Sequence, residues 1–175
     1  MTLRIGEAPP SALLAAAGGA LTASGELLRM WGVHHIGAIS RTRSNRLGPL
    51  IATGPFAYMR NPLYVGNIAM WVGFAITARL LWLAPVIAVL LGLEYHAIVR
   101  WEEQLLESRL GAAYRDYAAR VPRWLPRFGA APPLQQIDTA TSRPAFSLRE
   151  TLFSERGTLI AIAVGYALLF LKLTM

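Results

Sequence analysis

Residues 63–93, LYVGNIAMWVGFAITARLLWLAPVIAVLLGL, contain a single charged residue, Arg79. The uncharged runs on either side of it approach the length that a helix needs to cross a hydrocarbon core of about 30 Å. Two apolar runs separated by one charged residue predict a tight helical hairpin in a membrane. Pro85, near the start of the second run, is a candidate for a kink in that helix.

The whole chain is more apolar than a soluble domain. Of its 175 residues, 54% are hydrophobic and 15% are charged, and the mean hydropathy is +0.40. A soluble domain carries about a quarter charged residues. We therefore expect lipid to be the main solvent. The length predicts one domain over residues 1–175, with its motif core at 54–126.

Two further runs have near-spanning length. Residues 8–25 carry no formal charge, the apolar pattern continues to about residue 33, and Pro9 and Pro10 suit a first helical turn. A secretory signal peptide is the alternative, but this run is longer than a signal's apolar region and no basic cluster precedes it. Residues 157–171 form the last run. The sequence thus predicts an all-α polytopic membrane protein with about four transmembrane helices.

A short amphipathic helix is predicted on the cytoplasmic side, before the last span. Ser147 and Glu150 fit a capping box, and leucines lie one turn apart, so we expect residues 146–156 to lie on the membrane surface. The preceding residues 130–144 are rich in Pro, Ala, Thr and Gln and predict a surface loop.

The basic residues predict the orientation. Of the 17 basic residues, four lie between the first two predicted spans and nine between the last two: Arg41, Arg43, Arg46 and Arg60, then Arg100, Arg109, Arg115, Arg120, Arg123, Arg127, Arg143, Arg149 and Arg156. Loops rich in basic residues stay in the cytoplasm, so both termini are expected on the opposite side of an inner (plasma) membrane. The net charge of +7 also suits nucleic-acid binding, but the apolar runs are too long for a soluble basic domain.

The sequence lacks the residues and motifs that several kinds of catalytic and metal site require. There is no cysteine, which excludes disulfides, thiolate metal ligands and a cysteine nucleophile. His34, His35 and His96 lack the spacing of a zinc site, so no metal is expected. The glycine-rich nucleotide loops and the GxSxG and HExxH motifs are missing, and no strand–helix alternation of a soluble Rossmann enzyme is visible.

The stretch GPFAYMRNPLYVG (54–66) joins a polar, aromatic patch to the predicted hairpin. Asn61 fits an N-cap and Pro62 the first helical position. A helix N-terminus has N–H groups without helical partners and a partial positive charge, which suit an anion. The guanidinium of Arg60 adds a forked donor suited to a carboxylate.

A second patch begins at Glu102 and Glu103, after the hairpin. Adjacent helical residues point about 100° apart, so we do not expect both carboxylates to make the same contact. They are either a solvated helix face or a binding site. A stripe at three- and four-residue steps follows and predicts one helical face: Glu103, Leu106, Leu110, Tyr114, Tyr117 and Val121. This stripe is either a core face or a border for an aromatic or cationic ligand.

Together the patches resemble the small integral-membrane methyltransferases typified by isoprenylcysteine carboxyl methyltransferase and phosphatidylethanolamine N-methyltransferase. In that family Arg-His-Pro is followed by a Tyr and a Gly at the spacings of Tyr64 and Gly66, and here Asn61 replaces the histidine. Asn61 can cap and donate hydrogen bonds but cannot titrate near neutral pH. Residues 121–126, VPRWLP, resemble the family's closing Val-x-Arg-x-x-Pro stretch.

The resemblance implies methyl transfer from S-adenosylmethionine to a lipid-like or membrane-partitioned acceptor: an isoprenylcysteine-like carboxylate, a phospholipid amine or a thiol. The implied cofactor-binding residues are Arg60, Asn61, Pro62, Tyr64, Gly66, Glu102, Glu103, Tyr114 and Tyr117, and Arg123 and Trp124 are implied for the acceptor. An ammonium acceptor must lose a proton, and the candidate bases are the ionisable groups of the predicted helices, Glu26, His34 and Glu94.

Two other classes of protein stay open. A membrane reductase using NADPH shares a helical membrane scaffold, although this short chain offers few residues for the extra phosphates. A non-catalytic membrane subunit would pack through small residues such as Ala15, Gly19, Ala69 and Gly73. Cofactor binding separates these classes from a methyltransferase.

Overall fold

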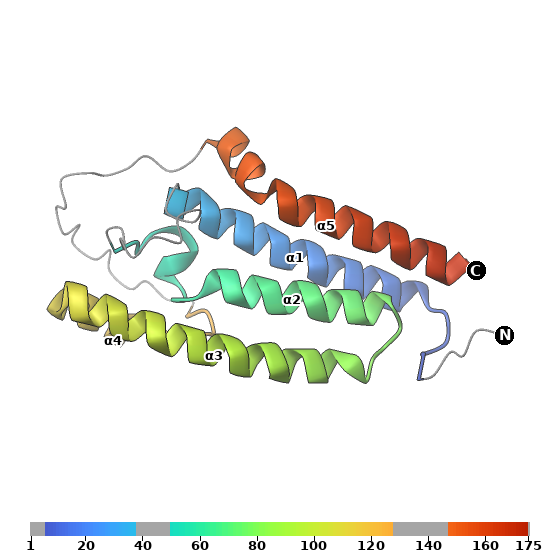
Figure 1. Ribbon diagram of the computed structural model, residues 1–175, viewed down its shortest axis with the longest axis horizontal. Coiled ribbons are helices and arrows are strands. Elements are labelled where there is room, and N and C mark those ends of the chain that lie inside the picture. Colours follow the sequence, from blue (N-terminus) through green and yellow to red (C-terminus); the bar gives the residue numbers. More distant parts are fainter. Residues whose placement is uncertain (1–5, 38–49, 128–146, 175) are drawn as a thin grey trace.

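The computed structural model describes residues 6–37, 50–127 and 147–174 (Figure 1). Within these ranges the chain is all-helical, as predicted: α1 (Ala12–Ile36), the 3-10 helix η2 (Gly54–Ala57), α2 (Pro62–Thr77), α3 (Leu83–Leu110), α4 (Ala112–Arg120) and α5 (Leu148–Thr174). Helices α5, α1, α2 and α3 lie side by side along the long axis, and α4 lies at the same end of the bundle as η2 (Figure 1).

Helix α1 begins later than its prolines suggested. Ser11 is the N-cap, and its hydroxyl oxygen accepts a hydrogen bond from the Leu14 N–H at 3.3 Å. This bond satisfies one of the N–H groups that a first turn leaves without a helical partner. Pro9 and Pro10 therefore precede the helix and do not form its first turn, contrary to the prediction.

Glycines bring the backbones of α1 and α2 close together. A Cβ at Gly25 would lie 2.6 Å from the carbonyl oxygen of Gly66, and one at Gly73 would lie 2.6 Å from the carbonyl oxygen of Gly18. The two glycines of each helix are two turns apart, so the same close contact repeats along the interface. A side chain at any of these positions would push the helices apart.

Hydroxyl groups join α5 to the same interface. The Tyr166 hydroxyl donates to Thr22 Oγ1 at 2.8 Å and lies 3.3 Å from Thr77 Oγ1. Thr22 and Thr77 also donate to the carbonyls of Gly18 and Gly73, each at 3.0 Å. Lipid offers no hydrogen-bond partners, so buried hydroxyls in a membrane protein must find theirs within the bundle.

The predicted hairpin is confirmed as α2, α3 and the short turn between them. Pro85 lies in the first turn of α3, where its missing N–H removes no helical hydrogen bond, so the expected cause of a kink is absent. In the turn, Arg79 has a φ of 64° and a buried guanidinium that bonds Glu7 at 2.9 Å. Glu7 also lies 2.8 Å from Lys172 Nζ, so one carboxylate links the N-terminal segment, this turn and the end of α5.

Helix α5 is continuous from Leu148 to Thr174. The predicted capping box is confirmed, because the Glu150 N–H donates to Ser147 Oγ at 3.3 Å and the Ser147 N–H donates to the Glu150 carboxylate at 2.8 Å. The separate amphipathic helix predicted over residues 146–156 is wrong for the described part. Residues 148–156 are the first turns of α5, since Gly157 continues the helix and does not end it. Residue 146 and the predicted loop 130–144 lie outside the described residues.

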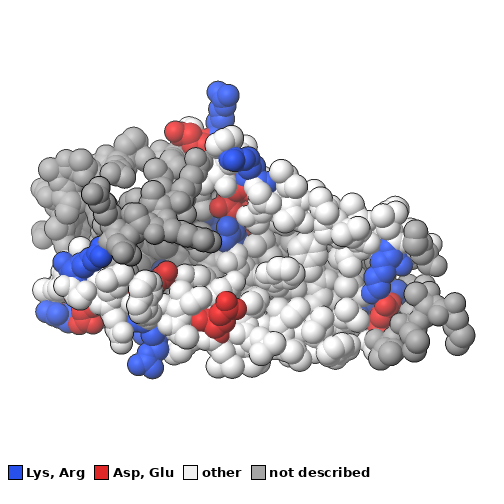
Figure 2. All heavy atoms as spheres, viewed as in Figure 1, with Lys and Arg blue, Asp and Glu red and all other residues white. Residues whose placement is uncertain are grey.

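Among the helices of the described ranges, α3 and α5 are long and apolar enough to cross a membrane. Only 6% of the apolar window of each is buried, unlike the core helix of a soluble protein. Helix α2 is apolar but has 16 residues, and α1 carries Glu26 and Arg29 in its second half. Length and composition thus support two of the four predicted spans. Charged side chains gather toward the two ends of the molecule, with mostly uncharged atoms between them (Figure 2).

The glycine contact between α1 and α2 is testable by adding one methyl group. In Gly25→Ala the new Cβ meets the Gly66 carbonyl oxygen at 2.6 Å, and we expect a loss of about 1–3 kcal/mol in the free energy of unfolding. Gly19→Ala is the matched control, because nothing lies within 4 Å of a Cβ there and alanine favours helix by up to about 1 kcal/mol. Denaturant unfolding in detergent measures both. Equal stability of the two variants would contradict the close contact.

Candidate functional site

The C-terminal half of α3 and all of α4 form the wall of the candidate site. The chain turns between them at Gly111, whose φ of 54° favours glycine. The residues that pack together across this turn are Leu106, Leu110, Tyr114, Tyr117 and Val121. Five of the six residues of the predicted stripe therefore pack together, but the prediction of one helical face is wrong, because the turn divides them between α3 and α4 and Val121 follows α4.

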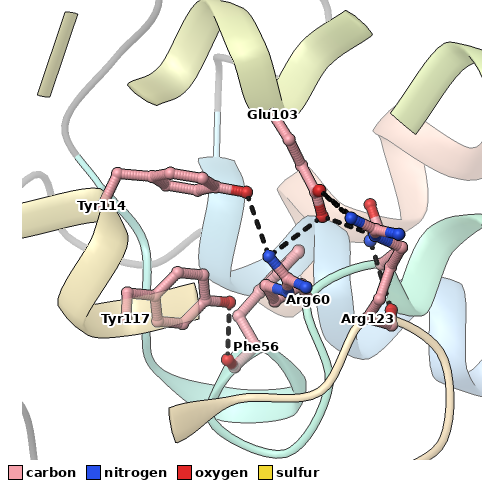
Figure 3. Close-up of polar contacts among 7 residues, drawn as sticks. Phe56, Arg60, Glu103, Tyr114, Tyr117 and Arg123 are labelled. Carbon is pink, nitrogen blue, oxygen red and sulfur yellow. Dashed lines mark hydrogen bonds and ion pairs between the residues drawn. The ribbon is translucent and has the colours of Figure 1, made fainter. Parts of the chain in front are cut away.

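One carboxylate, that of Glu103, holds two arginines beside the first turn of α2. It accepts hydrogen bonds from Arg123 Nη2 at 2.6 Å and Nε at 3.1 Å, and lies 3.1 Å from Arg60 Nη1 (Figure 3). The hydrogen bonds to Glu103 raise the pKa of Arg123 above its ordinary value. The side chains of Glu103 and Arg60 are 13% and 14% exposed, so water screens their attraction little.

Asn61 and Pro62 begin α2 as predicted, but Asn61 does not cap it with its side chain. The Asn61 amide instead donates to the Arg123 carbonyl at 3.2 Å, and the Arg60 N–H donates to the Pro122 carbonyl at 2.9 Å. These bonds fasten the segment after α4 to the start of α2. The N–H groups of the first turn are thus left without a side-chain cap within the described ranges.

The two tyrosines of α4 contact different partners. The Tyr117 hydroxyl donates to the Phe56 carbonyl at 2.8 Å, whereas the Tyr114 hydroxyl accepts from Arg60 Nη1 at 3.5 Å (Figure 3). Burial raises the pKa of Tyr117, with a smaller contribution from Tyr114. Burial and the nearby Glu103 carboxylate raise the pKa of Tyr114 as well. Both phenols therefore stay protonated at neutral pH, and Tyr117 anchors η2 to α4.

Glu102 has a different partner from Glu103, as their helical offset predicts. Its Oε1 accepts a hydrogen bond from the Tyr64 hydroxyl at 3.0 Å, and the Tyr64 ring packs against Tyr95 with centroids 4.7 Å apart. Among the described residues Tyr64 is the one that donates to Glu102. A carboxylate can accept about four hydrogen bonds. Glu102 can therefore accept further hydrogen bonds, whereas the oxygens of Glu103 are already paired with two arginines.

The three candidate bases lie apart from this cluster. Glu26 is buried in α1, 3.6 Å from Arg29 Nε, and neither of its oxygens accepts a hydrogen bond within the described ranges. His34 Nδ1 lies 3.4 Å from Thr151 Oγ1 of α5, and Glu94 is exposed on α3. In the part of the chain that the structure describes, no hydrogen bond or ion pair joins any of the three directly to the paired α3 carboxylates.

Sequence reasoning missed the two partners of Arg29 that lie on other helices. Its Nη2 lies 2.7 Å from Glu155 Oε2 of α5, and its Nη1 donates to Asn67 Oδ1 of α2 at 2.6 Å. The Asn67 amide in turn donates to the Tyr95 hydroxyl at 3.4 Å. A polar residue inside an apolar helix was the signal available for Asn67. Glu155 was assigned to a surface helix, which concealed its role.

Two other predicted site residues pack against the protein itself. A Cβ at Gly66 would lie 2.6 Å from the Gly25 carbonyl oxygen and 2.7 Å from Arg29 Cγ, so α1 occupies the space over this glycine. Trp124 is half-buried and lies beside His96, with ring centroids 6.3 Å apart.

An apolar groove of about 670 Å³ runs between α2, α3 and α5. Its lining is mostly apolar and includes Trp71, Phe74, Leu83 and Ile162. Arg29, Asn67 and Thr158 also line it, which gives a mostly apolar groove a charged group, an amide and a hydroxyl. Asn67 lies one helical turn from Tyr64, so one lining residue of the groove neighbours the Tyr64–Glu102 pair.

A family model described as phospholipid methyltransferase matches residues 13–113, more than half of the chain. The match covers α1, α2 and α3, including the Arg60 motif and both site glutamates. The chain therefore belongs to the phospholipid methyltransferase family, as its sequence resemblance predicted.

Two curated relatives match a shorter segment. The nickel-cobalt-cadmium resistance protein NccN of Alcaligenes xylosoxydans xylosoxydans is 40% identical over 78 residues, and the cobalt-zinc-cadmium resistance protein CzcN of Cupriavidus metallidurans is 33% identical over 78 residues. Each match spans 45% of this chain and 36% of the relative. No solved structure matches the chain.

The anchoring role of Tyr117 predicts a pH-dependent stability difference. Tyr117→Phe leaves the buried Phe56 carbonyl without its donor and should lower the free energy of unfolding by about 1–2 kcal/mol at neutral pH. The difference from wild type should narrow above about pH 10, because unfolded tyrosine ionises there while folded Tyr117, with its raised pKa, does not. Denaturant unfolding at the two pH values measures this. A difference that does not change with pH would contradict the burial of the phenol.

Proposed function

We propose that this protein transfers a methyl group from S-adenosylmethionine to a lipid-like acceptor at the cytoplasmic face of a membrane. Family membership supports methyl transfer, and the exposed apolar surfaces of α3 and α5 support an acceptor drawn from the bilayer. The observation that carries the proposal is the meeting of two distant sequence patches beside the start of α2. There Glu103 pairs with Arg60 and Arg123, and the adjacent Glu102 accepts from Tyr64.

S-adenosylmethionine supplies, when bound, a methyl group activated by a sulfonium. The groups at the start of α2 fit the carboxylate of its methionine part. Arg60 Nε is buried without a hydrogen-bond acceptor among the described residues, and a bound carboxylate would supply one. The uncapped N–H groups of the first turn, after Asn61 and Pro62, add donors and a partial positive charge.

We assign the cofactor's amino group to Glu102, not to Glu103. Glu102 retains acceptor capacity beside Tyr64, whereas Glu103 already neutralises two guanidinium groups. In this assignment Glu103 orients Arg60 and Arg123, and the Tyr114 hydroxyl contacts Arg60. Tyr117 contributes by holding η2 in place through the Phe56 carbonyl.

The acceptor's apolar chain is assigned to the groove between α2, α3 and α5. The groove is lined mostly by apolar side chains, and its lining residue Asn67 is one helical turn from Tyr64. A chain bound with its reactive end at Asn67 would present that end toward the Tyr64–Glu102 pair. Arg123 and Trp124 stay candidates for the acceptor's head group. Close approach of two held reactants lowers the entropic part of the barrier.

A base is needed only for an ammonium acceptor. The oxygens of Glu26, which accept no hydrogen bond within the described ranges, lie beside Arg29 of the groove lining and are the first choice for that proton. His34 and Glu94 are the other candidates. A carboxylate or thiolate acceptor would need none of them.

The same proposal includes a topology. Helices α1, α2, α3 and α5 form four membrane spans in one domain. The loops rich in arginine and the site face the cytoplasm, where S-adenosylmethionine is made, and both termini face the opposite side of an inner membrane.

Isothermal titration with S-adenosylhomocysteine tests the cofactor assignment. The detergent-purified protein should bind saturably, and Glu102→Gln should weaken binding by at least about tenfold, because it removes a charge-assisted hydrogen bond. Glu107→Gln, an exposed carboxylate one turn along α3, should bind like wild type. No saturable binding by wild type would overturn the proposal, and titration with NADPH would then test the reductase alternative.

The acceptor assignment is tested by narrowing the groove. Ala161 of α5 lines the groove, and Ala161→Phe should raise the KM for a lipid acceptor severalfold while leaving the affinity for S-adenosylhomocysteine unchanged. Ala163→Phe is the matched control, because Ala163 is also exposed on α5 but is not part of the lining. Identical acceptor kinetics in both variants would place the acceptor elsewhere.

A further inference from the structure

A chain of hydrogen bonds and one ring contact crosses the helical bundle from α5 to the site carboxylate on α3. We call its members the polar relay: Arg29 of α1, Asn67 and Tyr64 of α2, and Tyr95 and Glu102 of α3. The three helices that carry the relay lie side by side, with α5 beyond α1 (Figure 1).

The first step of the relay fixes the orientation of one amide. Arg29 Nη1 donates to Asn67 Oδ1 at 2.6 Å, and a guanidinium has no acceptor to offer. Asn67 must therefore turn its carbonyl oxygen toward α1 and its NH₂ group toward α3, where it donates to the Tyr95 hydroxyl at 3.4 Å. Without Arg29, no donor on α1 would select the orientation in which the Asn67 carbonyl oxygen points toward α1.

The second step connects Tyr95 to Glu102 through Tyr64. The rings of Tyr95 and Tyr64 are in contact, with centroids 4.7 Å apart and planes at 34°. The Tyr64 hydroxyl donates to Glu102 Oε1 at 3.0 Å. Two packed rings have little freedom to move separately, so the direction of the Tyr64 hydroxyl depends on where Tyr95 is held.

Arg29 is itself fixed from outside the region that the family model covers. Glu155 of α5 lies 2.7 Å from Arg29 Nη2, and both side chains are mostly buried, at 16% and 6% exposed. The family match ends at residue 113, before α5 begins. In this chain a residue beyond the matched region therefore holds the first member of the relay.

The geometry points to Arg29 as a positioning residue for Glu102, acting through the polar relay and held in place by Glu155. The inference rests on the proposed function for the role of Glu102, but the relay itself can be tested without any ligand. Removing an upstream member should disturb the downstream pair even though the two do not touch.

The ligand-free test uses protein with ¹³C-labelled tyrosine rings in detergent. The Tyr64 signal is assigned by its loss in Tyr64→Phe. It should shift in Asn67→Leu and also in Arg29→Met combined with Glu26→Gln and Glu155→Gln, because this set also neutralises the two buried carboxylates beside Arg29. Tyr166→Phe is the matched control, because it removes a different hydrogen bond between α5 and α1 and should leave the Tyr64 signal unmoved. An unmoved Tyr64 signal in both relay variants would overturn the inference.

The second readout is affinity for S-adenosylhomocysteine. Asn67→Leu should weaken binding by about tenfold, whereas Tyr166→Phe should not, although both lower stability. In a Tyr64→Phe background Asn67→Leu should have no further effect, since the relay is already cut at Glu102. Additive losses in this cycle would overturn the inference. If wild type binds no S-adenosylhomocysteine, the proposed function fails, and the tyrosine signals alone decide whether the relay exists.

Discussion

The close backbone contact between α1 and α2 is the constraint on which the other features depend. Gly25 faces Gly66 and Gly18 faces Gly73, so the two helix backbones approach each other closely at both points. This closeness lets the stem of Arg29 lie over Gly66, from which its guanidinium reaches Asn67 of α2. With larger residues between the helices, these polar groups would have to find other partners, which lipid does not provide.

Each cluster of charges in the described bundle is arranged around a shared partner. Glu103 forms ion pairs with both Arg60 and Arg123. Arg29 lies between the carboxylates of Glu26 and Glu155. The Glu7 carboxylate forms ion pairs with Arg79 and with a lysine of α5. Sharing reduces the number of charged groups that must be buried, and each burial of an unpaired charge would cost several kcal/mol. It also links segments that are distant in sequence, and Glu103 in this way joins the start of α2 to the segment after α4.

Much of the fold was readable from hydrophobic patterning. The hairpin, the Asn61–Pro62 start of α2 and the capping box at Ser147 follow from local rules, and the structure has them. The failures were local signals overruled by context. Pro9 and Pro10 suited a first turn, but Ser11, the next residue, is the N-cap of α1. Residues 148–156 were predicted to be part of a separate surface helix. They are the first turns of α5, because none of these residues ends the helix.

The site was predicted as two patches, and its internal pairing was not. Spacing alone places Glu102 and Glu103 on different sides of a helix, but it cannot tell which one meets an arginine. That choice depends on the turn at Gly111, which brings Arg123 back beside Glu103. Asn67 and Glu155 escaped notice because their partners lie on other helices. The hydrogen-bond partner of a polar side chain inside an apolar helix can be identified only when the neighbouring helix is known.

The most direct measurement is transfer of label from methyl-labelled S-adenosylmethionine into the lipid extract of membrane vesicles incubated with the purified protein. The account predicts saturable labelling by wild type and by Glu107→Gln, and its loss in Glu102→Gln. Absence of label in the lipid extract with wild type, or equal labelling by Glu102→Gln, would contradict it.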